Sequence, residues 1–494
     1  MKKTLSVENR QFFRLLADSA TTNPFSDDYM NLQLKIADCD ASTKMSERLE
    51  RTVTRVAERV RKLEEGDCTD FTRFGSEDRE LLQRAFLFDT YHRYMSLLDR
   101  HIGDQAKAGE KPIPVLFYRD IFSDLCRRGF SQEEAGRYFA IFYQVCRAFF
   151  FIERSLIGRS ESMKQLRRHL WNNVFTNDIQ IYEKHLWNRM EDFSTMLLGD
   201  TGTGKGAAAA AIGQSGFIPF DEKRGSFVES FIGSYKALNL SQFPESLIES
   251  ELFGHRKGAF TGAVEAHEGI FARCSAYGAI FLDEIGDVNE PIQIKLLHVL
   301  QDRNFSPVGS HETRRFRGRI IAATNRSLED LRMSGQFRDD FYYRLCSDII
   351  VVPSLHRRIM EDPEEMDDLV SLIVRRISGE SSSEVLDMIR RKMAHSPGKD
   401  YVWPGNVREL EQAVRRILLT GSYLGDKQIL ASDLQSQLHK GIEEGSLDAE
   451  TLVSGYCELL YERHGTYEEV ARRTNLDRRT AKANIQKYRK SECP

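Results

Sequence analysis

One stretch of the chain has residue types and spacing suited to phosphate binding, the sequence GDTGTGKG at residues 199–206. Its glycines permit a tight loop with inward-pointing amides, and Lys205 can reach the β- and γ-phosphates of a nucleotide. Gly206 stands where the usual pattern has a magnesium-binding Ser or Thr. The predicted nucleotide contacts are Gly199, Asp200, Thr201, Gly202, Thr203, Gly204, Lys205 and Gly206.

Two acidic residues downstream suit the hydrolysis of a bound nucleotide. The sequence AIFLDE at 279–284 places Asp283 and Glu284 at the end of an apolar run, where the carboxyl end of a strand faces a ligand crevice. Asp283 is suited to holding magnesium, directly or through water, and Glu284 to polarising the attacking water. A third run ends in Thr324 and Asn325, which can orient that water or sense the γ-phosphate. The alternative for the acids is helix capping.

These residues need a sheet to bring them together. Short apolar runs at 195–199, 279–284 and 319–325 alternate with helical stretches, the pattern of an α/β domain with a parallel sheet. The phosphate loop lies between the first of these runs and an alanine-rich segment with high helix propensity. We therefore expect strand, loop and helix in that order around Lys205.

The remaining chain is predicted to be helical. Apolar residues at three- and four-residue spacing over 46–65 predict an amphipathic helix, and residues 137–158 are apolar on more than one face. We expect a multidomain protein with an all-helical N-terminal region, an α/β domain and a helical C-terminal end. The predicted boundaries are 1–154, 155–355, 356–425, a linker at 426–449, and 450–494.

Composition narrows the class of protein. A chain of 494 residues is too long for one core, and 41% hydrophobic with 29% charged residues is typical of globular proteins. No apolar run approaches the roughly 20 residues of a membrane helix, and the N-terminus lacks the apolar segment of a secretory signal. Eight cysteines occur without a CxxC pair, which favours free thiols in a reducing cytoplasm.

The C-terminal end is more basic than the rest of the chain. Residues 466–490 contain eight basic and three acidic residues, a net charge of +5, whereas the whole chain has −4. The segment 465–490 predicts a helix, a tight turn at 475–477 and a second helix that Asp477 can cap. A solvated basic helix is the alternative to a DNA-binding one. The candidate DNA contacts are Arg478, Arg479, Thr480, Lys482, Asn484 and Lys487, with Arg489 and Lys490 expected to meet phosphates.

Between the two nucleotide motifs lies a hexapeptide that a globular core does not require. GAFTGA at 258–263 places a single Phe between glycines. With it, the region 155–425 resembles the AAA+ domain of the bacterial enhancer-binding proteins, which activate sigma-54 RNA polymerase. The resemblance rests on ESELFGHRKGAFTGA, FLDEI, AATNR, FRDDFYYRL and WPGNVREL, all in family order. Residues 356–425 then resemble the AAA+ lid, and 450–494 a Fis-like helix-turn-helix.

The resemblance implies further roles. Asn239 matches an asparagine that holds the catalytic glutamate in an inactive rotamer, and Arg408 matches a second sensor on the lid. Arg338 and Arg344 match arginines offered to the ATP of the neighbouring subunit, which suits a permanently charged, forked guanidinium. The implied cofactors are ATP and Mg²⁺, the latter held by Asp283. The implied assembly is a ring, hexameric in this family.

The resemblance also implies a binding partner for the single Phe of this hexapeptide. In this family the loop rises from the ring when ATP is bound and inserts into sigma-54, so Phe260 becomes a binding anchor. A Phe260 that packs against its own domain is the alternative. The implied partners are the sigma-54 RNA polymerase holoenzyme, double-stranded DNA and further copies of the chain, with no membrane. The sigma-54 contacts would be Gly258, Ala259, Phe260, Thr261, Gly262 and Ala263.

The chain departs from the family in several places. The segments 171–193 and 217–239, on either side of the phosphate loop, are longer than the family norm. Pro307 replaces an arginine common in a second loop near the pore, and Ala272 replaces a usual glutamate. Two other functions therefore stay open beside transcription activation. They are a nucleotide-switched DNA-binding regulator and an AAA+ remodeller of another protein.

Overall fold

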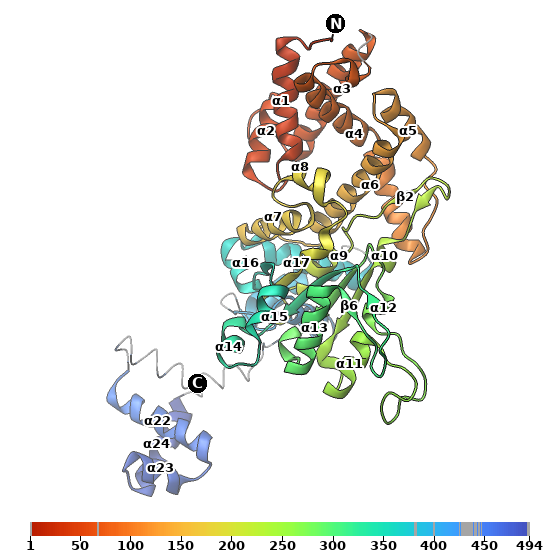
Figure 1. The fold of residues 1–494 in the computed structure, drawn as a ribbon. Coiled ribbons are helices and arrows are strands. Elements are labelled where there is room, and N and C mark those ends of the chain that lie inside the picture. Colours follow the sequence, from red (N-terminus) through yellow and green to blue (C-terminus); the bar gives the residue numbers. More distant parts are fainter. Residues whose placement is uncertain are drawn as a thin grey trace. The chain divides into compact units, whose positions relative to one another are not determined.

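The computed structural model describes residues 2–66, 69–379, 383–398, 401–423 and 447–491, together with residues 425, 438, 442 and 445 (Figure 1). The linker predicted at 426–449 lies largely outside these residues. Two of the eight cysteines, Cys68 and Cys493, lie wholly outside them. The chain forms two compact units, one of Met1–Ser382 with Val402–Gln412 and one of Ser383–Tyr401 with Ala413–Pro494. Each unit is described by itself.

The N-terminal region of the first unit is helical. Its helices are α1 (Val7–Thr21), α2 (Asp27–Ala37), α3 (Met45–Glu65), α4 (Ser76–Ala108), α5 (Tyr118–Arg127) and α6 (Gln132–Phe149), followed by a π-helical turn at Phe150–Arg154. The amphipathic helix predicted at 46–65 is confirmed as α3, which buries Thr52, Val56 and Val60. A capping box at Ser131 and Glu134 starts α6, since each side chain accepts from the other residue's backbone amide.

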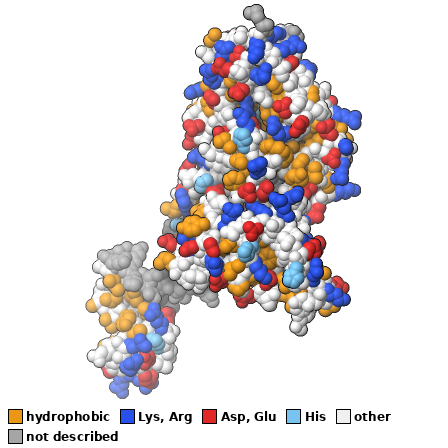
Figure 2. All heavy atoms as spheres, viewed as in Figure 1, with side chains coloured by type: hydrophobic (Ala, Val, Ile, Leu, Met, Phe, Trp, Pro, Cys, Tyr) orange, Lys and Arg blue, Asp and Glu red, His pale blue; other side chains and the backbone are white. Residues whose placement is uncertain are grey.

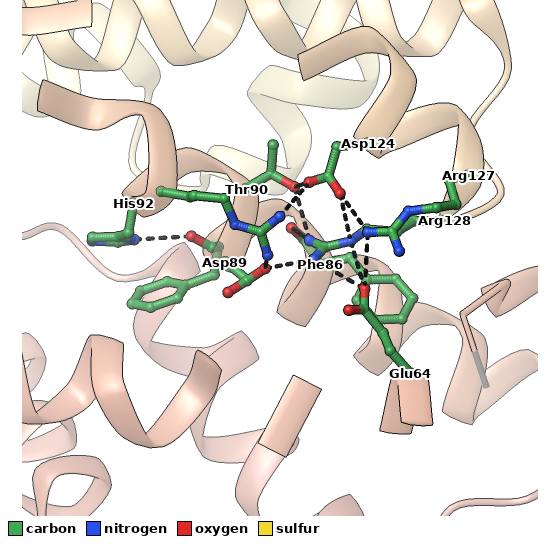
Figure 3. Close-up of polar contacts among 10 residues, drawn as sticks. Glu64, Phe86, Asp89, Thr90, His92, Asp124, Arg127 and Arg128 are labelled. Atoms are coloured by element: carbon green, nitrogen blue, oxygen red, sulfur yellow. Dashed lines mark hydrogen bonds and ion pairs between the residues drawn. The ribbon is translucent and has the colours of Figure 1, made fainter. Parts of the chain in front are cut away.

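Buried charges fix three of these helices to one another. The Arg128 guanidinium on the end of α5 is fully buried and donates to Asp89 on α4 at 2.6 Å, with Glu64 of α3 at 3.1 Å (Figure 3). Arg128 also donates to the Phe86 carbonyl at 3.0 Å and to the Thr90 hydroxyl at 2.9 Å. A buried ion pair of this kind is costly to break from one side, so this network holds α3, α4 and α5 in one arrangement.

A five-stranded parallel sheet forms the centre of the α/β domain. Its strands are β1 (Thr195–Leu198), β4 (Tyr235–Asn239), β5 (Ala279–Asp283), β8 (Arg319–Thr324) and β9 (Asp348–Val351), in the order β4-β5-β8-β1-β9. The three strands predicted from apolar runs are confirmed as β1, β5 and β8. Because β1 lies between β8 and β9, the loop that follows it opens at the crevice where parallel sheets bind ligands.

Helices surround this sheet and continue into the lid region. They are α7 (Glu161–Phe175), α9 (Lys205–Gly213), α10 (Phe231–Ser234), α11 (Glu245–Phe253), α12 (Ile270–Arg273), α13 (Glu290–Asp302), α14 (Leu328–Met333), α15 (Asp339–Leu345), α16 (Leu355–Glu361) and α17 (Glu364–Ser378). A short α8 (Ile179–Ile181) and the pairs β2 (Phe220–Asp221) with β3 (Ser226–Phe227) and β6 (Asn304–Phe305) with β7 (Arg314–Arg315) complete the first unit. The fold is thus mainly helical α/β with one parallel sheet.

The N-terminal helices meet the α/β domain at the two segments that are longer than in the family, 171–193 and 217–239. The β2–β3 hairpin lies beside α6 (Figure 1), and Phe217, Phe227 and Phe231 belong to the same hydrophobic core as α1, α4 and α6. Phe227 stacks on Tyr143 of α6, with ring centroids 3.8 Å apart. The N-terminal core therefore extends across the boundary predicted at residue 154.

The second unit contains the C-terminal helices. Helix α18 (Ser383–His395) and most of α19 (Asn406–Thr420) belong to it, together with α22 (Ala449–His464), α23 (Tyr467–Thr474) and α24 (Arg478–Ser491). The helices α22, α23 and α24 share a small core of Cys457, Leu460, Val470, Ala481 and Ile485. The helix, turn and helix predicted at 465–490 are present as α23, a turn at Asn475 and α24.

The surface mixes charges of both signs. Figure 2 shows Lys, Arg, Asp and Glu side chains interspersed over the face in view, so the net charge of −4 is a small difference between many opposite charges. Among the described helices, none is both long enough and apolar enough to cross a membrane.

Candidate functional site

The phosphate loop connects β1 to α9 in the predicted order. Gly202 has φ +81°, and a β-carbon at this position would lie 2.3 Å from the carbonyl oxygen of Gly405. A side chain would therefore both strain the backbone and collide with the lid backbone just before α19 (Asn406–Thr420). Gly202 lets the lid backbone approach the loop directly, where the Val407 amide donates to the Gly202 carbonyl at 3.0 Å.

Lys205 begins α9 with its ammonium held inside the loop. Its Nζ donates to the carbonyl oxygens of Gly199 at 2.7 Å and Asp200 at 3.2 Å. Burial lowers the pKa of Lys205, and the carboxylates of Glu284 and Asp283 oppose that shift. The loop thus holds a positive charge at the N-terminus of a helix, an arrangement that binds phosphate.

The two predicted acids lie at the carboxyl end of β5. Asp283 is the last residue of the strand, and its Oδ1 accepts from the amide of Glu284 at 3.1 Å. Glu284 has φ +58°, an uncommon backbone conformation for a residue with a side chain. Burial raises the pKa of both carboxyls. Lys205 opposes the shift at Asp283, whereas Asp283 reinforces it at Glu284. Perturbed pKa values of this kind gather at functional sites.

Asn325, after β8, connects the acids to the phosphate loop. Its Nδ2 donates to the hydroxyl of Thr201 at 3.0 Å, and its amide donates to Oε2 of Glu284 at 3.4 Å. Thr324 is buried, and its hydroxyl accepts from the amide of Arg326 at 3.1 Å. The structure therefore brings the loop, the acids and the third strand end into one crevice.

The residues in this crevice fit a nucleotide with magnesium. Among the described residues, no group of three or more His, Cys, Asp and Glu side chains could hold a metal by itself. Mg²⁺ is usually bound by one or two carboxylates together with substrate phosphates and water. Asp283, close to Lys205 and the loop, supplies a donor of that kind. A β-carbon on Gly206 would come no closer than 4.0 Å to a neighbouring atom, the Cε1 of Phe281, so this position leaves space.

Asn239 lies next to the acids but makes a different contact from the expected one. It pairs with Asp283 across the β4–β5 ladder. Its Oδ1 accepts from the amide of Ser241 at 3.0 Å and from the Ser241 hydroxyl at 2.7 Å. The side-chain oxygen thus caps the turn after β4, and no hydrogen bond to Glu284 occurs among the described residues.

The lid contacts the phosphate loop through the start of α19. Asn406 is buried with φ +53°, and its Nδ2 donates to the Thr201 carbonyl at 3.1 Å while its Oδ1 accepts from the Leu355 amide at 2.7 Å. Sequence reasoning singled out Arg408 here and missed Asn406. The Pro-Gly-Asn turn before α19 was the available signal, because Asn tolerates positive φ.

Arg408 is exposed beside this junction. A β-carbon on Gly202 would lie 3.0 Å from the Cβ of Arg408. Burial lowers the pKa of Lys205, and the positive charge of Arg408 lowers it further. Arg408 is therefore placed near the expected phosphates.

The two predicted trans-acting arginines differ in their partners. Arg338 donates to Glu290 at 2.6 Å and to both carboxylate oxygens of Asp340 at 2.8 and 3.0 Å. Arg344, exposed near the end of α15, donates from Nε to the Leu300 carbonyl at 3.1 Å. It has no ion pair with a described residue. Arg344 is thus the more available of the two for a neighbouring subunit.

The GAFTGA hexapeptide forms a closed hairpin tip. The Gly258 amide donates to the Ala263 carbonyl at 2.8 Å, and the Ala263 amide to the Phe260 carbonyl at 3.0 Å. Phe260 is 38% exposed, with its ring centroid 4.9 Å from that of His255. A β-carbon on either glycine would meet nothing within 4 Å. One side of the Phe260 ring therefore packs on its own domain while the rest faces solvent.

A second loop lies beneath this hairpin. The Arg256 amide donates to the Val308 carbonyl at 3.1 Å, and the Arg256 side chain pairs with Glu312 at 3.1 Å. Pro307, which replaces a usual arginine, belongs to this supporting loop. Movement of either loop must therefore involve the other.

The C-terminal helices present part of their predicted basic surface. Asp477 caps α24, accepting from the amides of Arg479 at 2.9 Å and Thr480 at 3.0 Å. Arg479 is exposed and makes no ion pair within the described residues. Three other candidates have acidic partners, Arg478 with Glu468, Lys487 with Glu450 and Arg489 with Glu458. The helix start is thus more available to an anion than its end.

Comparisons with known proteins show which families and relatives this chain is similar to. Residues 173–350 match the family of the sigma-54 interaction domain, and residues 363–450 match the AAA+ ATPase lid domain. The regulatory protein AtoC of Escherichia coli is 34% identical over 303 residues, which cover 59% of this chain and 60% of AtoC. The Nif-specific regulatory protein of Azotobacter vinelandii is 39% identical over 264 residues, covering 53% and 44%.

One more relative and one solved structure are also similar to this chain. The sigma-54-dependent transcriptional activator SfnR of Pseudomonas putida is 40% identical over 243 residues, which cover 49% of this chain and 60% of SfnR. The chain thus matches about half of the length of these curated relatives. A crystal structure of NtrX from Brucella abortus with ATP superposes with a TM-score of 0.40 at 21% identity, covering 74% of this chain and 79% of NtrX. The chain thus contains a sigma-54 interaction domain and an AAA+ ATPase lid domain, and it is similar to proteins named as sigma-54-dependent transcriptional regulators.

Proposed function

We propose that this protein is an ATP-driven transcription activator that binds upstream DNA, assembles into a ring and remodels the closed complex of sigma-54 RNA polymerase. The observation that carries the proposal is the half-exposed Phe260 on a closed GAFTGA hairpin, in the same domain as the nucleotide crevice. A nucleotide-switched regulator without polymerase contact would not need an aromatic anchor there.

Each residue of the crevice has a different role in ATP hydrolysis. Lys205 and the loop amides bind the phosphates, and Asp283 would hold a magnesium ion, which would supply positive charge to neutralise the phosphates. Glu284 orients the attacking water, a role that its raised pKa and its contact with the Asn325 amide support. Thr324 and Asn325 sense the γ-phosphate, and Arg408 contacts it from the lid.

A neighbouring subunit completes the site. Arg344, without an ion pair in its own subunit's described residues, stabilises the transferring phosphoryl group across the interface. Arg338 acts beside it once its bonds to Glu290 and Asp340 are exchanged for phosphate. A ring, hexameric as in the family, then couples each site to its neighbour.

Nucleotide state controls the loop through the strand ends. Asn239 lies beside Asp283 in the sheet, so a rotamer change would bring its amide from Ser241 toward Glu284. The hairpin would then rise off His255, exposing the whole Phe260 ring to sigma-54. The other hexapeptide residues, Gly258, Ala259, Thr261, Gly262 and Ala263, give the tip its flexible backbone and its small contact surface.

DNA binding places the ring near the promoter. The helices α23 and α24 act as a helix-turn-helix motif, with α24 entering the major groove. Arg478, Arg479, Thr480, Lys482 and Asn484 contact bases or phosphates, and Lys487 contacts a phosphate. Binding would exchange the Glu468 and Glu450 ion pairs for phosphate contacts in the bacterial cytoplasm.

Single-round transcription from a sigma-54 promoter tests this function with the full chain. We expect ATP to drive open-complex formation, and a non-hydrolysable analogue to fail. Should ATP be hydrolysed without any open complex, the protein remodels another target. Should DNA bind without ATP turnover, it is a nucleotide-switched regulator.

A further inference from the structure

A cavity of about 730 Å³ lies between the N-terminal helices and the amino-terminal edge of the sheet, opposite the nucleotide crevice. Parallel strands begin at this edge, with Ala279 of β5 and Arg319 of β8 in its lining. The volume lies within the range of 300–1,000 Å³ typical of small-molecule sites. The predicted chemistry of ATP hydrolysis makes no use of this space.

Both parts of the first unit build the walls. Arg137, Ala140 and Gln144 line the cavity from one face of α6. The end of α9 lines it from the other side, through Ile212 and Gly213. Gln144 also donates to the Ser215 carbonyl at 2.9 Å, just beyond α9. A molecule in the cavity would therefore touch the N-terminal region and the helix of the phosphate loop together.

The lining has cationic groups without acidic partners. Arg137, Arg315 and Arg317 make no ion pair and no side-chain hydrogen bond with any described residue, and the Nε of Arg137 is buried without a partner. Arg319 is buried and donates only to neutral oxygens, those of Phe193, Asn173 and Thr195. Burial lowers the pKa of Arg319 to about 10, with Asp348 opposing, which fits a positive charge lacking a close counterion.

Four glutamates also line the cavity, but two of them already have partners. Glu134 accepts from the amide and hydroxyl of Ser131, both at 2.9 Å, and Glu222 accepts from Gln132 at 2.8 Å. Glu133 and Glu191 remain without a side-chain hydrogen bond in the part of the chain described. These neutral donors leave all four carboxylates charged, so the lining has four guanidiniums against four glutamates. The case for an anion therefore rests on Arg137, Arg315 and Arg317, whose guanidiniums have no hydrogen-bond or ion-pair partner among the described residues.

Flat apolar side chains supply the rest of the surface. Trp187, Phe217, Phe220 and Tyr277 all line the cavity, and the Trp187 and Phe217 rings pack edge to face at 4.7 Å. Aromatic faces of this kind accept planar ligands by stacking. The lining therefore offers a ligand both guanidiniums and aromatic rings.

We propose that this cavity is an effector site for a small organic anion with a planar apolar body, its carboxylate or phosphate bound by Arg137, Arg315 and Arg317. Occupancy would be felt at α9, which begins with Lys205. Binding itself does not depend on the proposed transcription function. Only its effect on ATP turnover does.

Calorimetric titration of the full chain tests the site. The probes are 1-naphthoate, 1-naphthyl phosphate and the neutral 1-naphthamide, with ADP present to fill the nucleotide crevice. We expect saturable binding of one anion per chain, about tenfold or more tighter than the amide because the charge-assisted contacts are lost in the amide. Whichever anion binds tighter identifies the natural head group as carboxylate or phosphate.

Two variants provide the matched comparison. Arg317→Gln should weaken anion binding about tenfold, whereas Arg189→Gln, an exposed arginine outside the lining, should leave it unchanged. Both side chains are exposed without ion pairs among the described residues, so both variants should fold. Equal affinity for anion and amide, equal loss in the two variants, or no binding of any probe would overturn the proposal. If the unaltered chain binds the anions but does not hydrolyse ATP, the proposed function is wrong and the proposed effector site is not.

Discussion

The Arg147 guanidinium of α6 donates a hydrogen bond to the Gln214 carbonyl, immediately after α9, at 2.7 Å. Its other nitrogen donates to the Gly216 carbonyl at 2.6 Å. Arg147 is fully buried, with its charge 4.5 Å from the Tyr143 ring. A cation at the carboxyl end of a helix is favourable, so the N-terminal region holds the far end of the helix that Lys205 begins.

Replacing this arginine should disturb ATP binding from a distance. Arg147→Met leaves two half-buried carbonyls without this donor, which should cost about 2–4 kcal/mol of stability. Because α9 loses its anchor, we also expect KM for ATP to rise more than kcat falls. Arg154→Met, at an exposed ion pair nearby, should change stability by about 0.5 kcal/mol or less. Identical ATP kinetics in both variants would leave Arg147 with a packing role only.

Truncating the hairpin aromatic should separate activation from hydrolysis. Phe260→Ala removes the proposed sigma-54 anchor but touches no residue of the crevice, so transcription should be abolished while most ATP turnover remains. Met333→Ala, an 81% exposed apolar residue on α14, serves as the control and should retain both activities. Equal loss of transcription and turnover in the Phe260 variant would indicate that the ring mainly packs against His255.

The role proposed for Glu284 can be tested by trapping bound ATP. Glu284→Gln should bind ATP normally and hydrolyse it about 10²-fold or more slowly, since the water loses its base. Filter binding and phosphate release measure the two quantities. Normal turnover in this variant would exclude Glu284 from the chemistry.

Mixed assemblies test the arginine supplied in trans. Arg344→Ala alone should lower turnover by about 10³-fold or more. A mixture with Glu284→Gln should recover activity, because some interfaces then combine an intact Glu284 with an intact Arg344. If the mixture stays as inactive as each variant alone, Arg344 does not act across the interface.

DNA affinity should fall steeply with salt if α24 meets phosphates. Arg479→Gln, at an exposed position without an ion pair among the described residues, should reduce the slope of log affinity against log salt by about 1. Arg473→Gln should change it less, because Arg473 already pairs with Glu469 at 2.9 Å. Titration of labelled duplex DNA at several salt concentrations gives both slopes. A response independent of salt would argue against phosphate contacts.

A buried histidine should make the N-terminal region sensitive to acid. Burial lowers the pKa of His101 to about 4, with Asp104 opposing, whereas an unfolded histidine titrates near about 6.5. The unfolded chain therefore binds this proton first, and stability is full above about pH 6.5 and falls between there and about pH 4. At about pH 5.5 the loss from His101 should be about 1.4 kcal/mol.

The ring contacts of His101 suggest the control. Its imidazole lies 5.7 Å from the Tyr143 ring and 6.1 Å from that of Phe227, between centroids. His101→Phe keeps an aromatic ring at this position but cannot take up a proton. Urea unfolding at about pH 8 and about pH 5.5 should show a smaller loss in the variant. Equal losses in both chains would mean that His101 is charged in the folded state.

Local patterns predicted which residues the fold brings together around Lys205. The glycine spacing placed Lys205 at a helix start, and the apolar runs placed Asp283, Glu284 and Asn325 at strand ends, because parallel strands share their carboxyl edge. The sequence could not predict which atoms meet. Asn239 caps its own turn instead of contacting Glu284, since a short polar side chain can bond equally well to a nearby amide.

The contacts between distant segments were beyond such patterns. Arg147 and Gln214 are far apart in the chain, and nothing in the residues around either one specifies the other. The unusual length of 217–239 was visible, but its use was not. Its aromatics, read along the chain, suit a loop or a strand equally, and only the folded core places Phe227 against Tyr143.

The aromatic core that Phe217, Phe227 and Phe231 share with the N-terminal helices has a practical consequence. A chain cut at residue 155 would expose this apolar face to water and promote aggregation, so an inactive truncation would not show what the N-terminal helices do. Nor would the N-terminal helices pack correctly on a related ATPase domain that lacks the β2–β3 hairpin. The N-terminal helices and the α/β domain of this protein therefore form one structural piece.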